Sequence, residues 1–297
     1  MVNPIDSIVP AGEATRRTSA WLLLGLMSLG VSSLFALLLA VARAPGMTPL
    51  PWLDGFFNTA LVLHVNLSAT VWFLAFSGAL WSRAGGAQWA GLDWMAFACT
   101  LVGALLLIVS PLISPGDPVL SDYLPTLRNP VFFAGFLSLF VGLALAALRA
   151  LLTIAPMGMV LAFGVPGSGL WAGAVLALLA LVAFVISYLR LPAELTGKAY
   201  FDPLYWAGGH VLQFTHVLLM LTVWLVLARA SGIVMPIAEQ WLGRLFWLGS
   251  APALMSCYSC LLHAPESLEH RQFFTGLMAW GSWLVVPVFI GGLFWGD

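Results

Sequence analysis

Charged residues are scarce in this sequence. Of its 297 residues, 8% are Asp, Glu, Lys or Arg, whereas a soluble domain carries about 25%. A chain with so little charge cannot cover a water-facing surface, which excludes a soluble enzyme. The eleven basic and twelve acidic residues are scattered singly and give a net charge of −1. Since no basic patch is present, we expect no binding to nucleic acid.

Lysine and cysteine are also rare. Lys198 is the only lysine, which limits Schiff-base chemistry to one candidate. The three cysteines, Cys99, Cys257 and Cys260, all lie within apolar runs. That arrangement does not suit a disulfide framework. The cysteines therefore give no information on the redox compartment.

Apolar residues make up most of the chain: 61% are hydrophobic and the mean hydropathy is +1.00. A helical run of about 20 apolar residues is long enough to cross the hydrocarbon core of a bilayer. The sequence has eight such runs: Thr18 to Val41, Phe56 to Trp81, Leu92 to Leu112, Val131 to Ile154, Leu170 to Leu191, Tyr205 to Ala230, Leu242 to His263 and Phe273 to Trp295. We therefore predict an all-α fold, a polytopic bundle of about eight transmembrane helices in the lipid bilayer. Residues 1–297 would form a single transmembrane domain.

The basic residues give a weak indication of orientation. With the N-terminus inside, six of them fall on the inner side: Arg16, Arg17, Arg83, Arg149, Arg229 and Arg244. Five fall on the outer side: Arg43, Arg128, Arg190, Lys198 and Arg271. By the positive-inside rule this small excess favours cytoplasmic termini, and we expect a multi-pass protein of a bacterial inner membrane.

Three histidines lie near an end of their apolar runs: His64, His210 and His263. Ionisable side chains in a membrane are costly, so each is a candidate functional residue. Even-numbered runs would begin and odd-numbered runs would end at the outer face. All three imidazoles would then lie within about two helical turns of the same face.

Neutral imidazole is the usual protein ligand of haem iron and of copper. Histidines at one depth on different helices could therefore converge on a buried haem or metal ion. We predict that His64 and His210 bind a cofactor and that His210 and His263 are metal ligands. In the alternative, each histidine only hydrogen-bonds a neighbouring helix.

Two further histidines are expected to stay outside this site. His216 follows His210 by six residues, which places it about 9 Å deeper and on another side of the helix. His270 lies in a polar segment beside Glu266 and Arg271, and we expect it to be solvated.

Other polar groups favour helix packing. The segment Cys257–His263 places two thiols and an imidazole three residues apart, which resembles a soft-metal stripe. Small, weakly polar residues at a helix contact explain it as well. Asn66, Ser68 and Thr70, after His64, are likewise expected to pack between helices.

The longest outer loops are residues 113–130 and 192–204. They carry four acidic residues: Asp117, Asp122, Glu194 and Asp202. Such loops could dock a partner, or their charges could simply face water.

Three short motifs lie around the histidines: Phe57–His64, Leu204–His210 and Arg271–Thr275. Together they resemble one family, the haem-copper oxidase subunit I superfamily, which includes the catalytic subunits of cytochrome c oxidase and nitric oxide reductase. Phe57–His64 resembles its second helix, whose histidine is an axial ligand of the low-spin haem. Leu204–His210 resembles its sixth helix, where Trp and Gly-His precede the first copper-ligand histidine. Arg271–Thr275 resembles the opening of helix eight, and His263 lies near the paired copper ligands of helix seven.

The resemblance covers the whole chain, which would correspond to the first eight of that family's twelve helices. Several residues that are typical of the family are absent from this sequence. In the family, helix ten supplies a ligand to each haem, so the remaining ligands here would come from a partner chain or a second copy. The paired histidines of helix seven are reduced to His263. Val211–Phe214 lacks the glutamate and tyrosine of many oxidases, and residues 280–295 lack the lysine of helix eight. Oxygen reduction by this chain alone is therefore not expected.

The resemblance implies a membrane subunit of a respiratory or other electron-transfer complex. It would bind a b-type haem and could also bind copper. Its partners would be other membrane subunits or a cytochrome. Two alternatives remain open. The chain could be a cofactor-free scaffold or anchor, or it could be part of a split oxygen or nitric oxide reductase completed by a partner chain.

Overall fold

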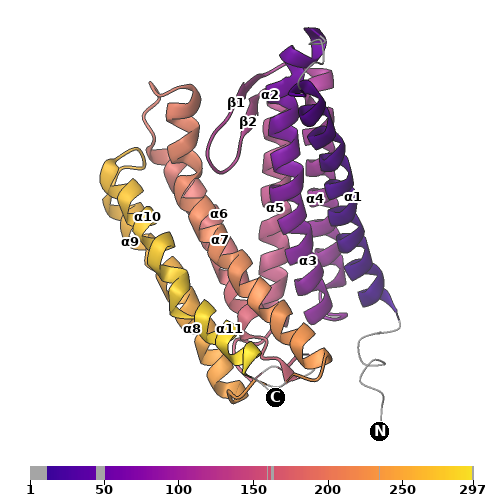
Figure 1. Ribbon diagram of the computed structural model, residues 1–297, viewed down its shortest axis with the longest axis vertical. Coiled ribbons are helices and arrows are strands. Elements are labelled where there is room, and N and C mark those ends of the chain that lie inside the picture. The colour runs from indigo at the N-terminus through magenta and orange to yellow at the C-terminus, as the bar shows by residue number, and fades with distance from the viewer. Residues whose placement is uncertain (1–11, 45–50, 159, 162–163, 234, 296–297) are drawn as a thin grey trace.

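The computed structural model describes residues 12–44, 51–158, 160–161, 164–233 and 235–295. These residues form a bundle of α-helices (Figure 1). Eight helical spans within them are long and apolar enough to cross a membrane. The prediction of an all-α polytopic bundle is therefore confirmed.

The first part of the chain forms α1 (Glu13–Ala42), α2 (Pro51–Val65), the π-helix η1 (Asn66–Val71), α3 (Trp72–Ala84), α4 (Ala90–Ile113), β1 (Asp117–Val119), β2 (Thr126–Arg128) and α5 (Pro130–Thr153). The second part forms α6 (Ser168–Arg190), α7 (Gly197–Ala230), α8 (Glu239–Leu254), α9 (Ser256–Leu262), α10 (Leu268–Gly281), the 3-10 helix η3 (Ser282–Leu284) and α11 (Val286–Phe294). Three spans are composite: α2 with η1 and α3, α8 with α9, and α10 with α11.

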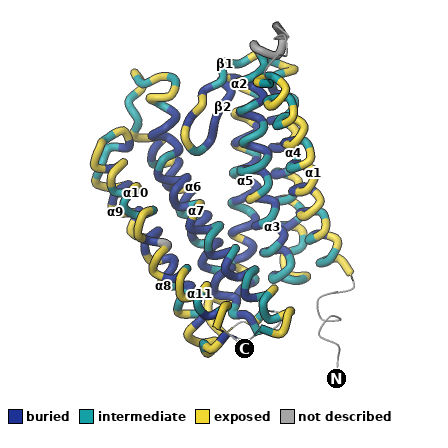
Figure 2. Tube along the Cα trace, in the orientation of Figure 1, coloured by how far each residue is buried: buried dark blue, intermediate teal, exposed yellow. Residues whose placement is uncertain are grey.

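The α6 and α7 pair is the centre of the bundle. One face of α6, which includes Leu170 and Ala174, packs into a hydrophobic cluster with α1 to α5. The other face, which includes Ala172 and Leu176, packs into a second cluster with α8 to α11. Figure 2 accordingly shows mostly buried residues along α6 and α7 and many exposed ones along α1. In a membrane, the exposed apolar flanks would face lipid.

Glycine allows α4 and α5 to approach closely. A Cβ atom added to Gly103 would lie 2.8 Å from the backbone oxygen of Gly135 and 2.8 Å from the nitrogen of Leu139. A Cβ on Gly142 would similarly lie 3.0 Å from the oxygen of Ala96. Small residues at such contacts are typical of membrane helices.

Several helices, α7 and α10 among them, begin earlier than the apolar runs indicate. Helix α7 begins at Gly197 rather than Tyr205, and α10 begins at Leu268 rather than Phe273. In α7 the polar residues of the added turns pair with each other, since Lys198 lies 3.1 Å from Asp202, four residues on. Such a pair stabilises a helix that hydrophobicity alone does not reveal.

The segment between α4 and α5 folds back toward the bundle. Strands β1 and β2 are antiparallel, with Asp117 opposite Arg128. Their connection, residues 120–125, is called the hairpin tip below. In Figure 1 this tip hangs between α5 and the α6 and α7 pair. The predicted outer loop 113–130 is thus a hairpin with its tip among the helices.

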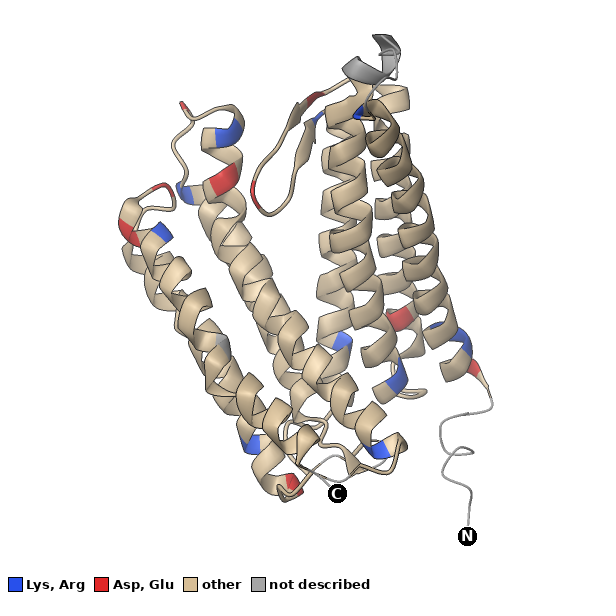
Figure 3. Ribbon diagram, in the orientation of Figure 1, with Lys and Arg blue, Asp and Glu red and all other residues tan. Residues whose placement is uncertain are grey.

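Charged side chains of the described residues gather toward the two ends of the bundle (Figure 3). The middle is almost free of them, as expected for the depth that would lie in hydrocarbon. The structure supports a bilayer environment, and the hairpin lies at the end away from the start of α1 (Figure 1).

Candidate cofactor site

The hairpin tip is attached to α7 and η1 by side chains. Asn66 of η1 is fully buried and its amide donates to the carbonyl of Pro125 at 2.6 Å. The ammonium of Lys198 in α7 lies 2.7 Å from the carboxylate of Asp122. The backbone N–H of Asp122 donates to Asp202 at 3.1 Å. These bonds fix the tip against two membrane-spanning segments.

They also change the interpretation of two of the four loop charges, whereas Asp117 and Glu194 are exposed, as expected for solvated charges. The side chain of Asp122 pairs with Lys198, and Asp202 is only 7% exposed within α7. The two acidic segments bind each other through these residues. The expectation of a partner at these loops remains untested.

Tyr123 at the tip covers His210. Its hydroxyl lies 3.0 Å from Nε2 of His210. Its ring packs on Gly209, where an added Cβ would lie 2.4 Å from a ring carbon of Tyr123. Burial, and then the carboxylate of Asp122, raise the pKa of Tyr123 above its ordinary value, so the hydroxyl stays protonated and can donate.

The other nitrogen of His210 is also engaged. Nδ1 lies 2.6 Å from the carbonyl oxygen of Trp206, one turn earlier in α7. A carbonyl can only accept, so Nδ1 carries the proton and Nε2 carries the lone pair. His210 is 3% exposed and its ring packs against Trp206 and Phe274.

The prediction that His270 is solvated is wrong. His270 lies in α10, two residues after its start, and is only 1% exposed. Its Nδ1 lies 3.1 Å from the hydroxyl of Ser259 in α9. Its Nε2 is buried and has no hydrogen-bond partner among the described residues. The charged neighbours in the sequence suggested a loop, whereas α10 turns this side chain inward.

The rings of His270 and His210 both pack against the ring of Phe274. The ring centroid of Phe274 is 4.9 Å from that of His270 and 5.2 Å from that of His210. Helices α7 and α10 thus bring two buried imidazoles to one neighbourhood under the hairpin tip. We call the group His210, Tyr123, Phe274 and His270 the histidine pocket.

His64 belongs to another neighbourhood. It is half-buried at the end of α2, and its Nδ1 lies 3.0 Å from the carbonyl oxygen of Ser32 in α1. The hydroxyl of Ser32 lies 2.9 Å from the same nitrogen and donates to the carbonyl of His64 at 2.8 Å. As in His210, the proton lies on Nδ1 and the lone pair on Nε2. The π-helix η1 follows directly, a feature that is frequent at functional sites.

The predicted residues therefore do not share one set of contacts. The described contacts of His64 are with α1, and those of His210 are with the hairpin tip and α10. His263 follows the last residue of α9 and packs against Tyr258. Among the described residues, no group of three or more His, Cys, Asp or Glu side chains could hold a metal ion.

Two other expectations have clear outcomes. The stripe Cys257–His263 is not continuous, because Cys257 is exposed, Cys260 is buried, and α9 ends before His263. His216 lies apart from the site, as predicted, and stacks on Phe73 with ring centroids 4.4 Å apart.

A buried ionic network at the other end of the bundle escaped the sequence analysis. Asp93 in α4 is 2% exposed and accepts from Arg17 at 2.8 Å, Trp21 at 3.0 Å and Ser82 at 2.6 Å. Arg149 of α5 lies 3.5 Å from the same carboxylate. The network joins α1, α3, α4 and α5. The sequence contains a signal of this network, because Asp93 follows the first residue of an apolar run, where a charge is costly.

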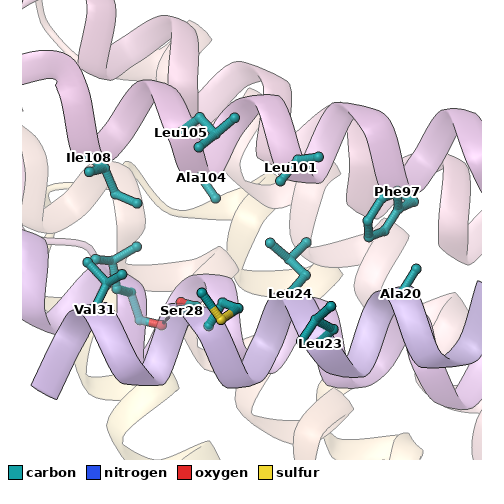
Figure 4. A pocket seen from close by; sticks show the side chains of 12 residues that line it. Ala20, Leu23, Leu24, Ser28, Val31, Phe97, Leu101, Ala104, Leu105 and Ile108 are labelled. Carbon is teal, nitrogen blue, oxygen red and sulfur yellow. Dashed lines mark hydrogen bonds between the residues drawn. The ribbon is translucent and has the colours of Figure 1, made fainter.

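An apolar groove lies between α1 and α4 (Figure 4). It has a volume of about 420 Å3, and Leu24, Phe97 and Leu101 are among its lining residues. The hydroxyl of Ser28, its one polar side chain, donates to the carbonyl of Leu67. The groove therefore offers no polar group for a hydrophilic substrate.

Asn66 provides a test of how the tip is held. We expect Asn66→Ala to lower the free energy of unfolding by about 1–3 kcal/mol, because it leaves the buried carbonyl of Pro125 without its donor. Unfolding in mixed detergent micelles would measure this change. Ser68→Ala is the matched control, since the Ser68 hydroxyl bonds only to carbonyls of its own helix. Equal effects of both substitutions would contradict the anchoring role.

Comparison with known proteins adds relatives but no activity. The chain is 32% identical over 222 residues to an uncharacterised protein of Aquifex aeolicus, a match that covers 70% of this chain and 53% of that protein. It is 30% identical over 251 residues to an uncharacterised protein of Rickettsia prowazekii, covering 72% of this chain and 47% of that protein. The chain thus spans about half the length of these relatives. No family model and no solved structure matches it.

Proposed function

We propose that this chain is a membrane subunit of a respiratory or other electron-transfer complex and binds a b-type haem through His64. The observation that supports this most is the orientation of the imidazole. Nδ1 of His64 is turned to the carbonyl of Ser32, which directs Nε2 to the opposite side of the ring. Histidines that ligate metals almost always make such a bond with their other nitrogen, because it fixes the tautomer and raises the basicity of the ligand.

The imidazole of His64 would suit haem iron, for which histidine is a common protein ligand. Haem would supply one-electron transfer when bound. Ser32 would hold the imidazole in place. Any further ligand would come from another part of the complex, with other membrane subunits or a cytochrome as partners.

The histidine pocket fits a copper ion only in part. His210 and His270 each present Nε2 with Nδ1 turned to another group. Two imidazoles are fewer than the three or more protein ligands that metal sites usually have. We propose that His210 is one ligand of a copper ion and that His270 lies beside it. The role of His263 as a metal ligand stays a prediction. We derive no chemical step through such an ion.

Spectroscopy tests the haem proposal. The protein, purified in mild detergent after expression with haem supply, should show b-type absorbance bands, and His64→Ala should abolish at least nine-tenths of the bound haem. His216→Ala is the matched control, because His216 is also an intramembrane histidine but stacks on Phe73 away from Ser32. A colourless wild-type protein, or equal loss in both variants, would contradict haem binding through His64.

One observation favours the cofactor-free scaffold as a second candidate. The hydroxyl of Tyr123 already satisfies Nε2 of His210, so this imidazole is fully hydrogen-bonded without any ligand. In a scaffold, His210 would serve to attach the hairpin tip to α7. Unchanged assembly and activity of the complex after combined replacement of His64 and His210 would support the scaffold.

We also propose a bacterial inner-membrane location with cytoplasmic termini, based on the small excess of arginine at the inner ends. The histidine pocket would then lie near the outer leaflet.

A further inference from the structure

The lone pair that would ligate a metal at His210 is occupied. Because Nδ1 of His210 bonds to the carbonyl of Trp206, only Nε2 can bind another atom, and Tyr123 lies 3.0 Å from it. One lone pair cannot accept the tyrosine proton and bind a metal atom at the same time. Ligand binding at His210 therefore requires Tyr123 to leave.

The hairpin tip can carry Tyr123 away as a unit. Its two strands have three residues each, and short two-stranded hairpins are marginally stable on their own. The tip is therefore held closed by the burial of Leu124 in the hydrophobic cluster and by polar contacts with α7 and η1, which include the bond from Asn66 to Pro125. The polar contacts nearest to Tyr123 are the pair between Lys198 and Asp122 and the backbone bond from Asp122 to Asp202.

The ion pair lies at an accessible edge, whereas Asp202 is only 7% exposed. The side chain of Lys198 is 56% exposed and that of Asp122 is 46% exposed, so water can compete for the pair. An exposed ion pair is worth little and can open readily. Tyr123 and His210, beneath it, are shielded.

We propose that the hairpin tip is a gate over the histidine pocket. In the closed state Tyr123 caps Nε2 of His210, and the pair of Lys198 with Asp122 latches the tip to α7. In the open state the tip swings away from Gly209, and Nε2 becomes available to a metal ion or to haem iron. The inference rests on the proposed function, since a gate is useful only if a ligand binds at His210.

Chemical modification of the whole protein in detergent tests the gate without any haem or metal. Diethyl pyrocarbonate modifies imidazole nitrogens that carry a free lone pair, and mass spectrometry of peptides gives a rate for each histidine. We expect slow modification of His210 in the wild type. Tyr123→Phe, which keeps the ring but removes the hydroxyl, should raise the rate at His210 about threefold to tenfold.

The latch variant separates a moving gate from a fixed cap. Asp122→Asn weakens the pair with Lys198 but does not touch His210, so a gate predicts an increase of about twofold to fivefold at His210. Asp117→Asn is the matched control, an exposed acid on the same hairpin that takes no part in the latch. The rate at His263 reports on general loosening.

Two outcomes would overturn the gate. One is a faster rate with Tyr123→Phe alone and none with Asp122→Asn, which would show a fixed cap. The other is an equal increase with Asp117→Asn, which would show loosening of the hairpin as a whole. A colourless protein in the haem experiment leaves this result unaffected, so failure of the cofactor role and failure of the gate are distinguishable.

Discussion

Asp93→Ala is expected to lower the free energy of unfolding by about 3–5 kcal/mol. The substitution leaves two buried guanidinium groups, those of Arg17 and Arg149, without their shared carboxylate. Removing one partner of a buried ion pair is strongly destabilising, because the remaining buried charges lose the carboxylate that balances them. Arg17 would keep only the exposed Glu13 as an ionic partner, and Arg149 would keep only bonds to backbone carbonyls. Unfolding by SDS in mixed micelles, followed by circular dichroism, would measure the change.

Two further variants make this test specific. Glu194→Ala removes an exposed acid and should change stability by less than about 0.5 kcal/mol. Replacing Arg17, Asp93 and Arg149 together by Met, Leu and Met should recover most of the loss, since apolar residues of similar volume can replace a buried ionic group. A single Asp93→Ala protein as stable as the wild type would show that the network contributes little.

Gly103→Val should disrupt the packing of α4 on α5, with a loss of about 3 kcal/mol or more. The nearest atoms to an added Cβ include backbone atoms of Gly135 and Leu139, which cannot rotate away as a side chain can. The helices would have to separate, and the contact of Gly142 with Ala96 would be lost with them. Thermal stability by size-exclusion chromatography after heating would report the effect.

Gly30→Val is the matched control for this substitution. Gly30 also lies in the middle of a membrane-spanning helix, α1, but an added Cβ there would meet nothing within 4 Å. Its stability should stay within about 0.5 kcal/mol of the wild type. If both glycine variants lose stability equally, helix propensity rather than close packing is responsible.

The eight spans could be predicted from the sequence because apolar run length is a direct consequence of bilayer thickness. The ends of the spans were less predictable. Polar residues such as Lys198 and Asp202 indicate a loop when considered singly, and only their mutual pairing in the structure explains why α7 includes them. The length of an apolar run predicts that a segment spans the membrane. It does not predict which side of the helix faces its neighbours.

The candidate site shows the same limit. His64 and His210 were singled out as ionisable groups in apolar runs, and both are engaged by neighbouring segments in the structure. His270 was missed because Glu269 and Arg271 flank it, although these neighbours point to other sides of α10. Tyr123 could not be identified, since nothing local indicates that a loop residue returns to cap a helix 87 residues later.

The π-helical turn η1 changes the phase of the helix that contains it. A turn that accommodates one extra residue rotates everything after it by about 100° relative to a regular helix. Before the turn, His64 is aimed at Ser32 of α1; after it, the indole of Trp81 donates to the carbonyl of Leu170 in α6. This rotation lets one membrane span contact α1 through His64 and α6 through Trp81. In a regular α-helix of the same length, the two side chains would not point toward these two helices together.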